Sequence, residues 1–357
     1  MSDAPPDADA LLAPLASHKA LLLAVSGGPD SVALMLLASR WSQRARHRIE
    51  IATVDHGLRP ESAEEARRVG EWTHALGFPH HALRWLGDKP ASRIQERARN
   101  ARYVLLAQCA REIGAREIGA REACAIVTAH HADDQAETVL FRLTRGSGVA
   151  GLAGMAPAST RDGVVLLRPL LGLRKRALED LCAAARHPFL RDPSNADASY
   201  ARPRLRALGE TLANQGLDGD ALLRLGRRAA RANEALDWAT TRLCDEALLL
   251  RDEAQARFSA SLLRAAPQEL LQRLIAREIV RLRGPEALRF DRLENAAHSL
   301  REALEKNAAR RITLGGALLD AGAAHVVIRP APPRRTASRE TLSARAVEHD
   351  SECDSRS

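Results

Sequence analysis

Short apolar runs alternate with amphipathic segments along the first half of the chain. The apolar runs have the length of buried strands, and the segments between them carry helical periodicity. The runs lie at residues 20–25, 49–54, 80–85, 125–128 and 164–167, and the helical segments at 30–40, 61–76, 91–113 and 130–143. Strands that alternate with helices predict an α/β fold with a mostly parallel sheet, covered by helices on both faces.

The pattern changes after about residue 205. The next hundred residues are rich in Ala, Leu, Arg and Glu, and they indicate helices with no clear strand. A short apolar stretch then predicts a β-hairpin, whose first strand would be interrupted by Gly315 and Gly316. We therefore expect a flexible lead-in at 1–18, an α/β domain at 19–206, a helical domain at 207–310, a small β-hairpin element at 311–330 and a disordered tail at 331–357.

Composition excludes several classes of protein. The 357 residues are 45% hydrophobic and 27% charged, which is typical of a globular protein and not of a disordered one. The aromatic content of 3% argues against an RNA reader that depends on stacked bases. A net charge of +8 favours a phosphate-rich partner, although a basic proteome would give the same balance.

Cysteine usage and hydropathy bear on the cellular compartment. The 5 cysteines contain no C-x-x-C pair, which argues against a disulfide framework and against a cysteine-rich zinc site. No run reaches the roughly 20 apolar residues of a membrane span, and the N-terminal residues lack the pattern of a secretory signal. We expect a cytoplasmic protein that does not enter a membrane.

The strongest local signal is a glycine loop between the first strand and the first long helix, with the sequence Ser26-Gly27-Gly28-Pro29-Asp30-Ser31. Glycines let successive backbone N–H groups point at an anion, and the helix N-terminus adds its dipole. No lysine follows the glycines, so this is not the G-x-x-x-x-G-K-[ST] loop. Asp30 beside an anion suggests a bridging Mg²⁺. The alternative is a simple turn in which Asp30 caps the helix.

A second cluster follows the fourth predicted strand. On a helix, His130, Asp134 and Glu137 share one face, as do His131, Asp134 and Thr138. Carboxylates at a strand end can hold Mg²⁺ or the ammonium group of a substrate. The alternative is that these acids only favour the helix dipole. We reject a zinc site on the two histidines, because no cysteine or third histidine lies nearby in sequence.

Two further loops carry candidate binding residues. His56 and Arg59 follow the second strand, where they can contact the adenine, ribose or phosphates of a nucleotide, or simply belong to a helix-capping loop. The loop Arg145-Gly146-Ser147-Gly148 is either a flexible cover over the substrate or a plain turn.

These motifs together resemble those of the PP-loop ATP pyrophosphatases, and more narrowly those of the bacterial tRNA(Ile)-lysidine synthetases. The resemblance covers about residues 20–206. The matching segments are 26–31, 54–59, 98–103, 129–138, 145–148, 151–155, 168–171 and 192–197. The family carries Arg-Asn near the end of this stretch, whereas this chain has Pro203, which removes a backbone donor.

The resemblance implies a Rossmann-like PP-loop domain of the adenine nucleotide alpha hydrolase type, and a two-step reaction. ATP would first adenylate the C2 oxygen of the wobble cytidine in a tRNA(Ile) with a CAU anticodon, and free L-lysine would then displace AMP. The implied site has ATP on residues 26–31 with His56 and Arg59, Mg²⁺ on Asp30 and Asp134, and Glu137 or His130 as the base.

The resemblance also implies that the segment 145–148 covers the acceptor base and that the helical region from residue 217 grips the tRNA. A homodimer is compatible with the sequence. The rival within the family is a tRNA 2-thiolation enzyme, which needs paired cysteines. A rival from another class is a tRNA-binding protein without catalysis, against which the intact loop and acidic residues argue.

Overall fold

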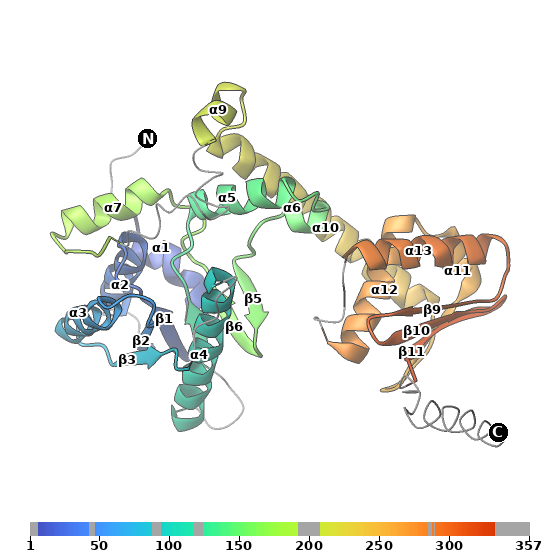
Figure 1. Cartoon of the computed structure of the whole chain (residues 1–357), viewed down its shortest axis with the longest axis horizontal. Coiled ribbons are helices and arrows are strands. Elements are labelled where there is room, and N and C mark those ends of the chain that lie inside the picture. The colour runs from blue at the N-terminus through green and yellow to red at the C-terminus, as the bar shows by residue number, and fades with distance from the viewer. Residues whose placement is uncertain are drawn as a thin grey trace, which may run out of the picture. The chain divides into compact units, whose positions relative to one another are not determined.

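The strands predicted from the apolar runs all form, and they lie in one sheet (Figure 1). They are β1 (Ala20–Ala24), β2 (Arg48–Asp55), β3 (His80–Arg84), β4 (Ala125–Val127) and β6 (Val164–Leu167). A strand that the sequence pattern missed, β5 (Ala158–Arg161), pairs antiparallel with β6 at the sheet edge. The order is β3-β2-β1-β4-β6-β5, and all pairs except β5·β6 are parallel.

A computed structural model describes residues 6–42, 47–87, 94–117, 124–191, 208–284, 288 and 290–332. The chain divides into two units, Met1–Asn233 and Glu234–Ser357, within helix α10 (Gly219–Ala247). This division lies later than the expected boundary at 206, because Leu222 at the start of α10 packs against Val139 and Leu140 of α5 (Ala132–Leu143). The predicted break itself, Pro203 and the segment 192–197 lie outside the described residues.

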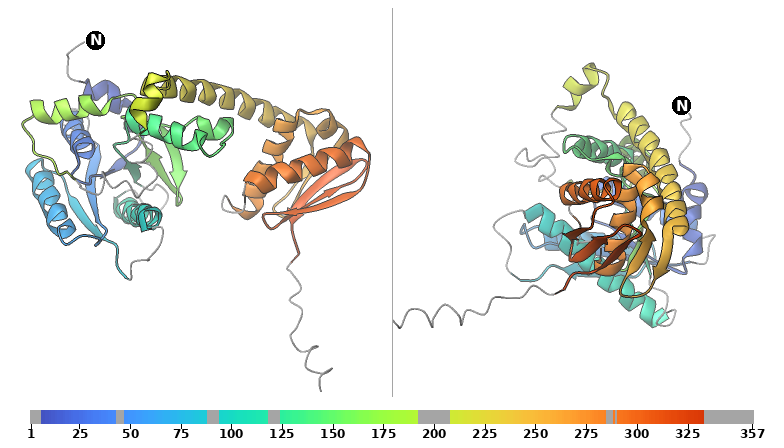
Figure 2. Two further views of the ribbon diagram at one scale, coloured as in Figure 1. Left: turned by 45° about the horizontal axis from the view of Figure 1, so that its top comes forward. Right: turned by 90° about the vertical axis from the view of Figure 1, so that its right-hand side faces the viewer.

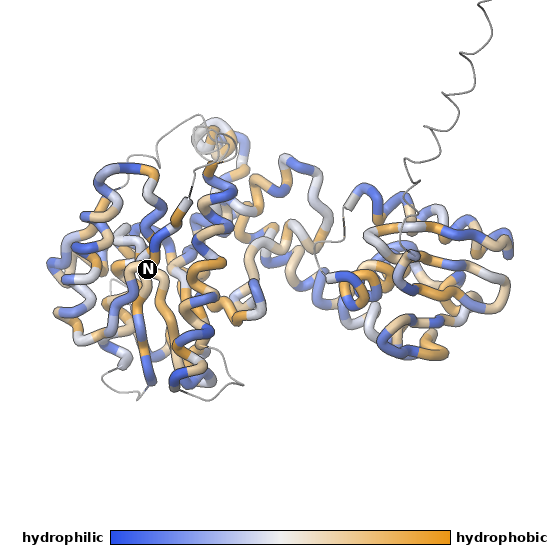
Figure 3. Tube along the Cα trace, turned by 60° about the horizontal axis from the view of Figure 1, so that its bottom comes forward, coloured by the Kyte–Doolittle hydropathy of each residue, from blue (hydrophilic) through white to orange (hydrophobic). Residues whose placement is uncertain are grey.

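Both faces of the sheet are buried, as the continuous apolar runs predicted. Leu21 and Leu23 of β1 belong to one hydrophobic cluster, whereas Ala20 and Leu22 belong to another. The first cluster includes residues of α2 (Pro29–Ser42), α3 (Ser62–Ala75) and α7 (Lys175–Ala184), and the second includes residues of α4 (Ile94–Glu117). The helices thus cover opposite faces (Figure 2), and apolar segments run through the interior of this unit (Figure 3).

The prediction of a flexible lead-in is wrong for the residues that the structure describes there. Residues Ala8–Leu12 form α1, and Ala13–Ser17 form a short 3₁₀-helix. Leu12 and Leu15 are 0% and 2% exposed, and both belong to the cluster around α2. The apolar pair three residues apart lies on one side of these helical turns, which outweighs the local content of Ala, Pro and Asp.

The second unit contains more strands than the sequence indicated. Its five-stranded antiparallel sheet has the order β7-β8-β11-β10-β9, so two strands lie inside the stretch expected to be helical. The strands are β7 (Leu248–Arg251), β8 (Ala256–Ser259), β9 (Arg310–Leu314), β10 (Ala317–Ala321) and β11 (His325–Pro330). The helices of this unit include α11 (Ala260–Ala265), α12 (Gln268–Arg283) and α13 (Phe290–Glu305).

The expected single hairpin at 311–330 is wrong as well, because β9, β10 and β11 form two successive hairpins. Gly315 and Gly316 have φ of 56° and 74°, and they form the two-residue connection between β9 and β10. Positive φ at both central residues is what a tight hairpin of this type requires. The glycine pair therefore ends a strand and does not interrupt one.

Of the helices that the structure describes, none combines the length and the apolar character needed to cross a lipid bilayer.

A buried carboxylate lies on β2, away from the glycine loop. The side chain of Glu50 is 3% exposed, accepts a hydrogen bond from Arg48 Nε at 2.8 Å and lies 2.5 Å from His81 Nε2. Burial alone would raise the pKa of Glu50, but its bonds to His81 and Arg48 bring the pKa below the ordinary value of 4.5. The ionised form is therefore the one that the fold stabilises.

This arrangement predicts an acid-sensitive contribution to stability. A lowered folded-state pKa means that Glu50 stabilises the fold above pH 4.5, and that this contribution is lost as pH falls through the folded pKa. We expect Glu50→Gln to lower the free energy of unfolding by about 1–3 kcal/mol at neutral pH. In denaturant titrations at decreasing pH, the difference in free energy of unfolding between Glu50→Gln and wild type should become smaller. Glu112→Gln is the control, because Glu112 is exposed on α4, and its free energy of unfolding should equal that of wild type at every pH. A gap that stays constant down to about pH 3 would contradict this assignment.

Candidate active site

The candidate residues gather because three parallel strands end at the same edge of the sheet. β1 lies between β2 and β4, and both pairs are parallel. The segments that follow these strands begin at Val25, His56 and Thr128 respectively. This carboxyl edge is where open α/β sheets bind ligands.

The loop after β1 is closed by hydroxyl groups. The Ser31 side chain donates to the Gly28 carbonyl at 2.9 Å and accepts from the Ser26 backbone N–H at 3.2 Å. The two serine hydroxyls are 3.4 Å apart. Helix α2 begins at Pro29, whose fixed φ suits the first helical position. The prediction of a turn that leads directly into a helix N-terminus is confirmed, so the loop can present N–H groups to an anion.

Gly27 is held in a conformation that only glycine adopts easily. Its φ is +86°, and a Cβ at this position would lie 2.5 Å from Leu190 Cδ1 and 3.0 Å from Val69 Cγ2. The Leu190 backbone N–H donates to the Gly27 carbonyl at 2.8 Å. The segment after α7 therefore supports the loop through a contact between distant parts of the chain, which the sequence pattern does not indicate.

The histidine that contacts Asp30 of the glycine loop is His131. Helix α5 begins at Ala132 with His131 as its N-cap: the ring Nδ1 accepts from the backbone N–H groups of Asp133 and Asp134, at 3.2 and 3.3 Å. The Asp134 carboxylate in turn accepts from the His131 N–H at 3.2 Å. His130 precedes the helix, and its Nδ1 lies 2.8 Å from Thr128 Oγ1. The prediction that His130 shares a helical face with Asp134 and Glu137 is therefore wrong.

Asp30, His131 and Asp134 form the acidic centre of this edge. His131 Nε2 lies 3.5 Å from Asp30 Oδ2 and 3.5 Å from Asp134 Oδ2, so the buried ring joins the two predicted carboxylates. Burial raises the pKa of Asp134, and the charges of Glu137 and Asp30 raise it further, against the opposing effect of His131. Burial would lower the pKa of His131, but its contact with Asp30 and the charge of Asp134 raise it above 6.5.

The carboxylates of this centre fit a divalent cation that also has other ligands. Asp30 Oδ1 is buried and has no hydrogen-bond partner among the described residues. In the same part of the chain, no three His, Cys, Asp or Glu side chains are arranged as a complete metal site. Mg²⁺ normally binds through one or two carboxylates together with waters and substrate phosphates. Asp30 and Asp134 match that requirement.

The residues after β2 line a separate cavity of about 350 Å³. Its walls include Asp55, Gly57, Arg59 and Arg84. Asp55 accepts from the Gly57 N–H at 2.7 Å and from Ser62 Oγ at 2.5 Å; burial opposes its charge, but these bonds hold its pKa below 3.8. Arg59 forms an ion pair with Glu65 at 2.7 Å. The cavity has the size of a small ligand site, so Asp55 is a candidate beside Arg59 in the segment that the sequence indicated.

His56 and the loop 145–148 each make aromatic contacts of their own. The His56 ring contacts Trp85 edge-on, with ring centroids 6.3 Å apart. Arg145 stacks on Phe141 at 4.3 Å, and the loop connects α5 to α6 (Val149–Leu152). Because α5 has 12 residues, its two ends are roughly 18 Å apart, so the loop lies far from Asp134.

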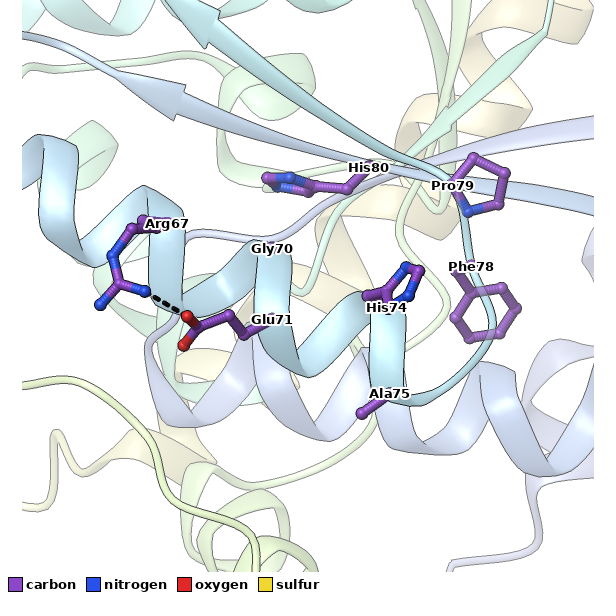
Figure 4. A pocket seen from close by; sticks show the side chains of 8 residues that line it. All are labelled: Arg67, Gly70, Glu71, His74, Ala75, Phe78, Pro79 and His80. Atoms are coloured by element: carbon purple, nitrogen blue, oxygen red, sulfur yellow. Dashed lines mark hydrogen bonds and ion pairs between the residues drawn. The ribbon is translucent and has the colours of Figure 1, made fainter.

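A larger cavity of about 690 Å³ lies between α3 and the start of β3 (Figure 4). Phe78, Pro79 and Ala75 supply apolar walls, and His74 and His80 supply rings. Because β3 starts here, the cavity is at the amino edge of the sheet, opposite the glycine loop. It has no part in the site described above.

A bridge connects the start of α5 to α10. Asp133 accepts from Arg174 Nη1 at 2.9 Å and from the Lys175 backbone N–H at 2.7 Å, and the other end of the Arg174 guanidinium donates to Asp220. Burial would raise the pKa of Asp133, but the donors from Lys175 and Arg174 lower it below 3.8. The first turn of α5, which carries the candidates His131 and Asp134, is therefore anchored through Asp133 to the start of α7 and, through Arg174, to α10.

Comparison with known proteins agrees with this geometry. A family model described as PP-loop domain matches residues 5–212. The chain is 45% identical over 345 residues to the tRNA(Ile)-lysidine synthase of Rhodopseudomonas palustris, covering 92% of this chain and 95% of that protein. It is 46% identical over 324 residues to that of Methylobacterium sp. strain 4-46, covering 89% and 91%.

A solved structure shows the same fold. The U34-tRNA thiolase NcsA from Methanococcus maripaludis, with its 4Fe-4S cluster, matches with a TM-score of 0.51 and 14% identity, covering 63% of this chain and 77% of that chain. At this identity the likeness concerns the fold alone. The two relatives by sequence share 45% and 46% identity with this chain, over 92% and 89% of its length. The chain therefore belongs to the tRNA(Ile)-lysidine synthase family of PP-loop proteins.

Proposed function

We propose that this protein uses ATP to attach free lysine to the wobble cytidine of a tRNA(Ile) that has a CAU anticodon. The observation that carries the proposal is the 45% identity, over 92% of the chain, to a protein named tRNA(Ile)-lysidine synthase. The product base, lysidine, pairs with A in place of G, so codon reading changes from AUG to AUA. ATP, lysine and tRNA occur together in the cytoplasm, where we place the activity. A homodimer stays a prediction.

In the first step, the cytidine C2 oxygen attacks the α-phosphorus of ATP, and the bond to the bridging oxygen of pyrophosphate breaks. The loop 26–31 supports this role, since it leads into the N-terminus of α2, whose first N–H groups and dipole favour the departing anion. We assign the adenosine to the cavity beside His56 and Arg59. Arg59 is tied to Glu65, so its expected contact with pyrophosphate requires that ion pair to open.

We propose that Asp30 and Asp134 hold Mg²⁺. The unpartnered Asp30 Oδ1 and the raised pKa of Asp134, which burial and neighbouring charge produce, support this assignment. When bound, the ion would offset charge on the phosphates. His131 keeps the two carboxylates at fixed separation through its Nε2.

In the second step, the lysine ε-amine attacks C2, the C2–O bond breaks, and AMP leaves. The amine must lose one proton to become a nucleophile and a second as the product forms, so a base is needed. We retain Glu137 for this role, because it is charge-coupled to Asp134 on α5. His130 is the weaker candidate, since its Nδ1 is engaged with Thr128. No covalent enzyme intermediate is required, and positioning supplies most of the catalysis.

We also propose that the loop 145–148 and the helical region from residue 217 contact the tRNA. Arg145 and Gly146 are exposed at the end of α5, and Arg224, Arg227 and Arg228 lie on α10. Such contacts would be to phosphates and would orient the RNA without reading its sequence.

The thiolation alternative has little support in the described residues. That chemistry needs reactive or cluster-binding thiolates. Burial raises the pKa of Cys109 and Cys182 to about 11 and that of Cys124 to about 12, and Cys244 is buried too. Thiols with such pKa values stay protonated and inert at neutral pH.

The bridge to α10 gives a testable prediction about positioning. Arg174→Ala should lower kcat about tenfold with a smaller change in the KM for ATP, because the turn that carries Asp134 loses one anchor. Arg176→Ala is the control, since that side chain is 92% exposed on the same helix. Equal kinetics for the two variants would show that the bridge does not position the site.

The experiment that tests the proposed function follows labelled lysine into RNA. Purified protein, ATP, Mg²⁺ and labelled lysine are mixed with a tRNA(Ile) transcript that has a CAU anticodon, and with a methionine tRNA transcript as the control. We expect label in the first RNA, with one AMP per lysine. AMP release without lysine in RNA would retain the nucleotide chemistry and overturn the substrate. RNA binding without any ATP turnover would favour a non-catalytic binding protein.

A further inference from the structure

Three arginines surround one buried tyrosine on the first unit, and a fourth arginine lies beside them. The guanidinium carbons of Arg99, Arg102 and Arg161 lie 5.3, 5.2 and 4.1 Å from the centre of the Tyr103 ring. Tyr103 is 1% exposed, and Arg99 Nη2 donates to its hydroxyl at 3.4 Å. Arg168 is the fourth member, since its Nη1 donates to Ser159 Oγ, two residues before Arg161 on β5. We call these four residues the arginine cluster.

The arginine cluster has little negative charge around it within the described part of the chain. Arg161 pairs with Asp162 at 3.7 Å, whereas no ion pair joins Arg99, Arg102 or Arg168 to a described carboxylate. Burial lowers the pKa of Arg102 and Arg168, and repulsion from neighbouring guanidinium groups lowers both further. Because the positive charges of the arginine cluster repel one another, an anion that binds between them would be stabilised.

Arg168 also shows an unmet hydrogen bond. Its Nη1 donates to the Ala156 carbonyl at 2.7 Å and to Ser159 Oγ at 3.1 Å, which fixes the direction of the side chain. Its Nε–H is buried and has no partner among the described residues. A buried guanidinium N–H without an acceptor is costly, so an acceptor supplied by a ligand would satisfy it.

Three members of the arginine cluster lie near the catalytic edge, whereas Arg161 lies opposite Val164 at the start of β6 and reaches the Tyr103 ring from there. Arg168 is the first residue after β6, so it stands at the carboxyl edge of the sheet. Arg99 and Arg102 lie near the start of α4, which connects β3 to β4 and so begins at that same edge. β6 is separated from β1 by β4 alone, which places the cluster two strand spacings, or about 10 Å, from the strand that ends at the loop.

We propose that the arginine cluster binds backbone phosphates of the RNA substrate, and so holds the anticodon loop next to the acidic centre. The inference rests on the proposed function and adds a binding site to it. One guanidinium group can donate two parallel hydrogen bonds to the oxygens of one phosphate. Successive phosphates of an RNA backbone can therefore bind several arginines at once. The proposed site of the ATP phosphates is the loop at residues 26–31, which leads into the N-terminus of α2. Tyr103 is too buried to stack on a base, so the contact is independent of base sequence.

The test measures tRNA binding by filter retention over a range of salt concentrations, with the full chain and the CAU transcript. Arg99→Gln and Arg168→Gln should each weaken binding about tenfold and reduce the salt dependence by about one counterion. Arg97→Gln is the matched control, since Arg97 is exposed on the same helix, two residues from Arg99. The KM for ATP should be unchanged in all three. Thermal melting identifies any variant whose fold is damaged, and Arg161→Gln replaces it.

Two results would overturn the inference. If the arginine variants raise the KM for ATP and leave tRNA binding intact, the cluster serves nucleotide phosphates. If folded variants change neither quantity, the cluster is only structural. The proposed function fails separately: without lysine incorporation by the wild type, the cluster can still be tested by binding, and weaker binding of tRNA by Arg99→Gln would support it.

Discussion

Asp30→Asn should abolish ATP-dependent modification of tRNA while leaving the fold and tRNA binding intact. Asparagine keeps the shape of the side chain but removes the charge that faces His131 and the loop. Because a bound cation is worth several kcal/mol to a phosphoryl-transfer transition state, we expect kcat to fall about a thousandfold. Single-turnover release of labelled pyrophosphate, measured over a range of Mg²⁺ concentrations, reports this loss directly.

Asp180→Asn is the control for this prediction. Its side chain is 73% exposed on α7, so loss of that charge should leave both kcat and the Mg²⁺ dependence unchanged. The assignment of Asp30 to Mg²⁺ predicts that higher Mg²⁺ restores part of the activity of Asp30→Asn. Wild-type rates in Asp30→Asn would show that the carboxylate has no catalytic role.

Gly27→Ala should prevent productive ATP binding. At φ +86° the added Cβ would lie 2.5 Å from Leu190 Cδ1, so both the backbone and its neighbour oppose the substitution. The loop must shift to relieve the contact, and its N–H groups then no longer converge on one anion. We expect the KM for ATP to rise about a hundredfold, or ATP binding measured by calorimetry to disappear.

Two companion variants separate steric from general effects. A Cβ at Gly28 would have Ser26 Oγ, 3.8 Å away, as its nearest neighbour, so Gly28→Ala should have a much smaller effect. Combining Gly27→Ala with Leu190→Ala removes the closest clash and leaves the 3.0 Å contact with Val69 Cγ2 and the backbone strain of about 1–2 kcal/mol, so part of the ATP binding should return. Equal effects of the two glycine variants would contradict this account of the loop.

The parallel sheet and the loop after β1 could be predicted because their signals are local. Continuous apolar runs such as residues 20–25 correspond to strands buried on both faces, and the alternation of Leu21 and Leu22 between two clusters explains why the runs are unbroken. The glycine loop is encoded by its own residues and by the helix that follows. Both features needed no knowledge of distant contacts.

The acidic centre was predicted only in part, because one residue shift at a helix start changes which side chain faces the site. Periodicity placed His130 in the helix, whereas the capping bonds of His131 begin it at Ala132. The signal was present in the sequence: Asp134 lies three residues after His131, as the acidic residue of a capping box does. Histidine is an unusual N-cap, so propensity alone did not favour this reading.

Contacts between distant segments could not be predicted from the pattern. Leu190 supports Gly27, and Arg174 joins Asp133 to Asp220, across separations that no local period records. In the second unit, β7 and β8 were missed because each has four residues inside a long helical composition. Their strand state comes from pairing, β8 with β11, and not from local propensity.

One measurement tests the central claim most directly: whether the α-phosphate of ATP becomes attached to the tRNA before lysine enters. The protein is mixed with ATP labelled at the α-phosphorus and the CAU transcript, without lysine, and the RNA is isolated after an acid quench. We predict labelled RNA, and loss of that label as AMP when lysine is added. Lysine incorporation with no label on the RNA at any time would contradict the account.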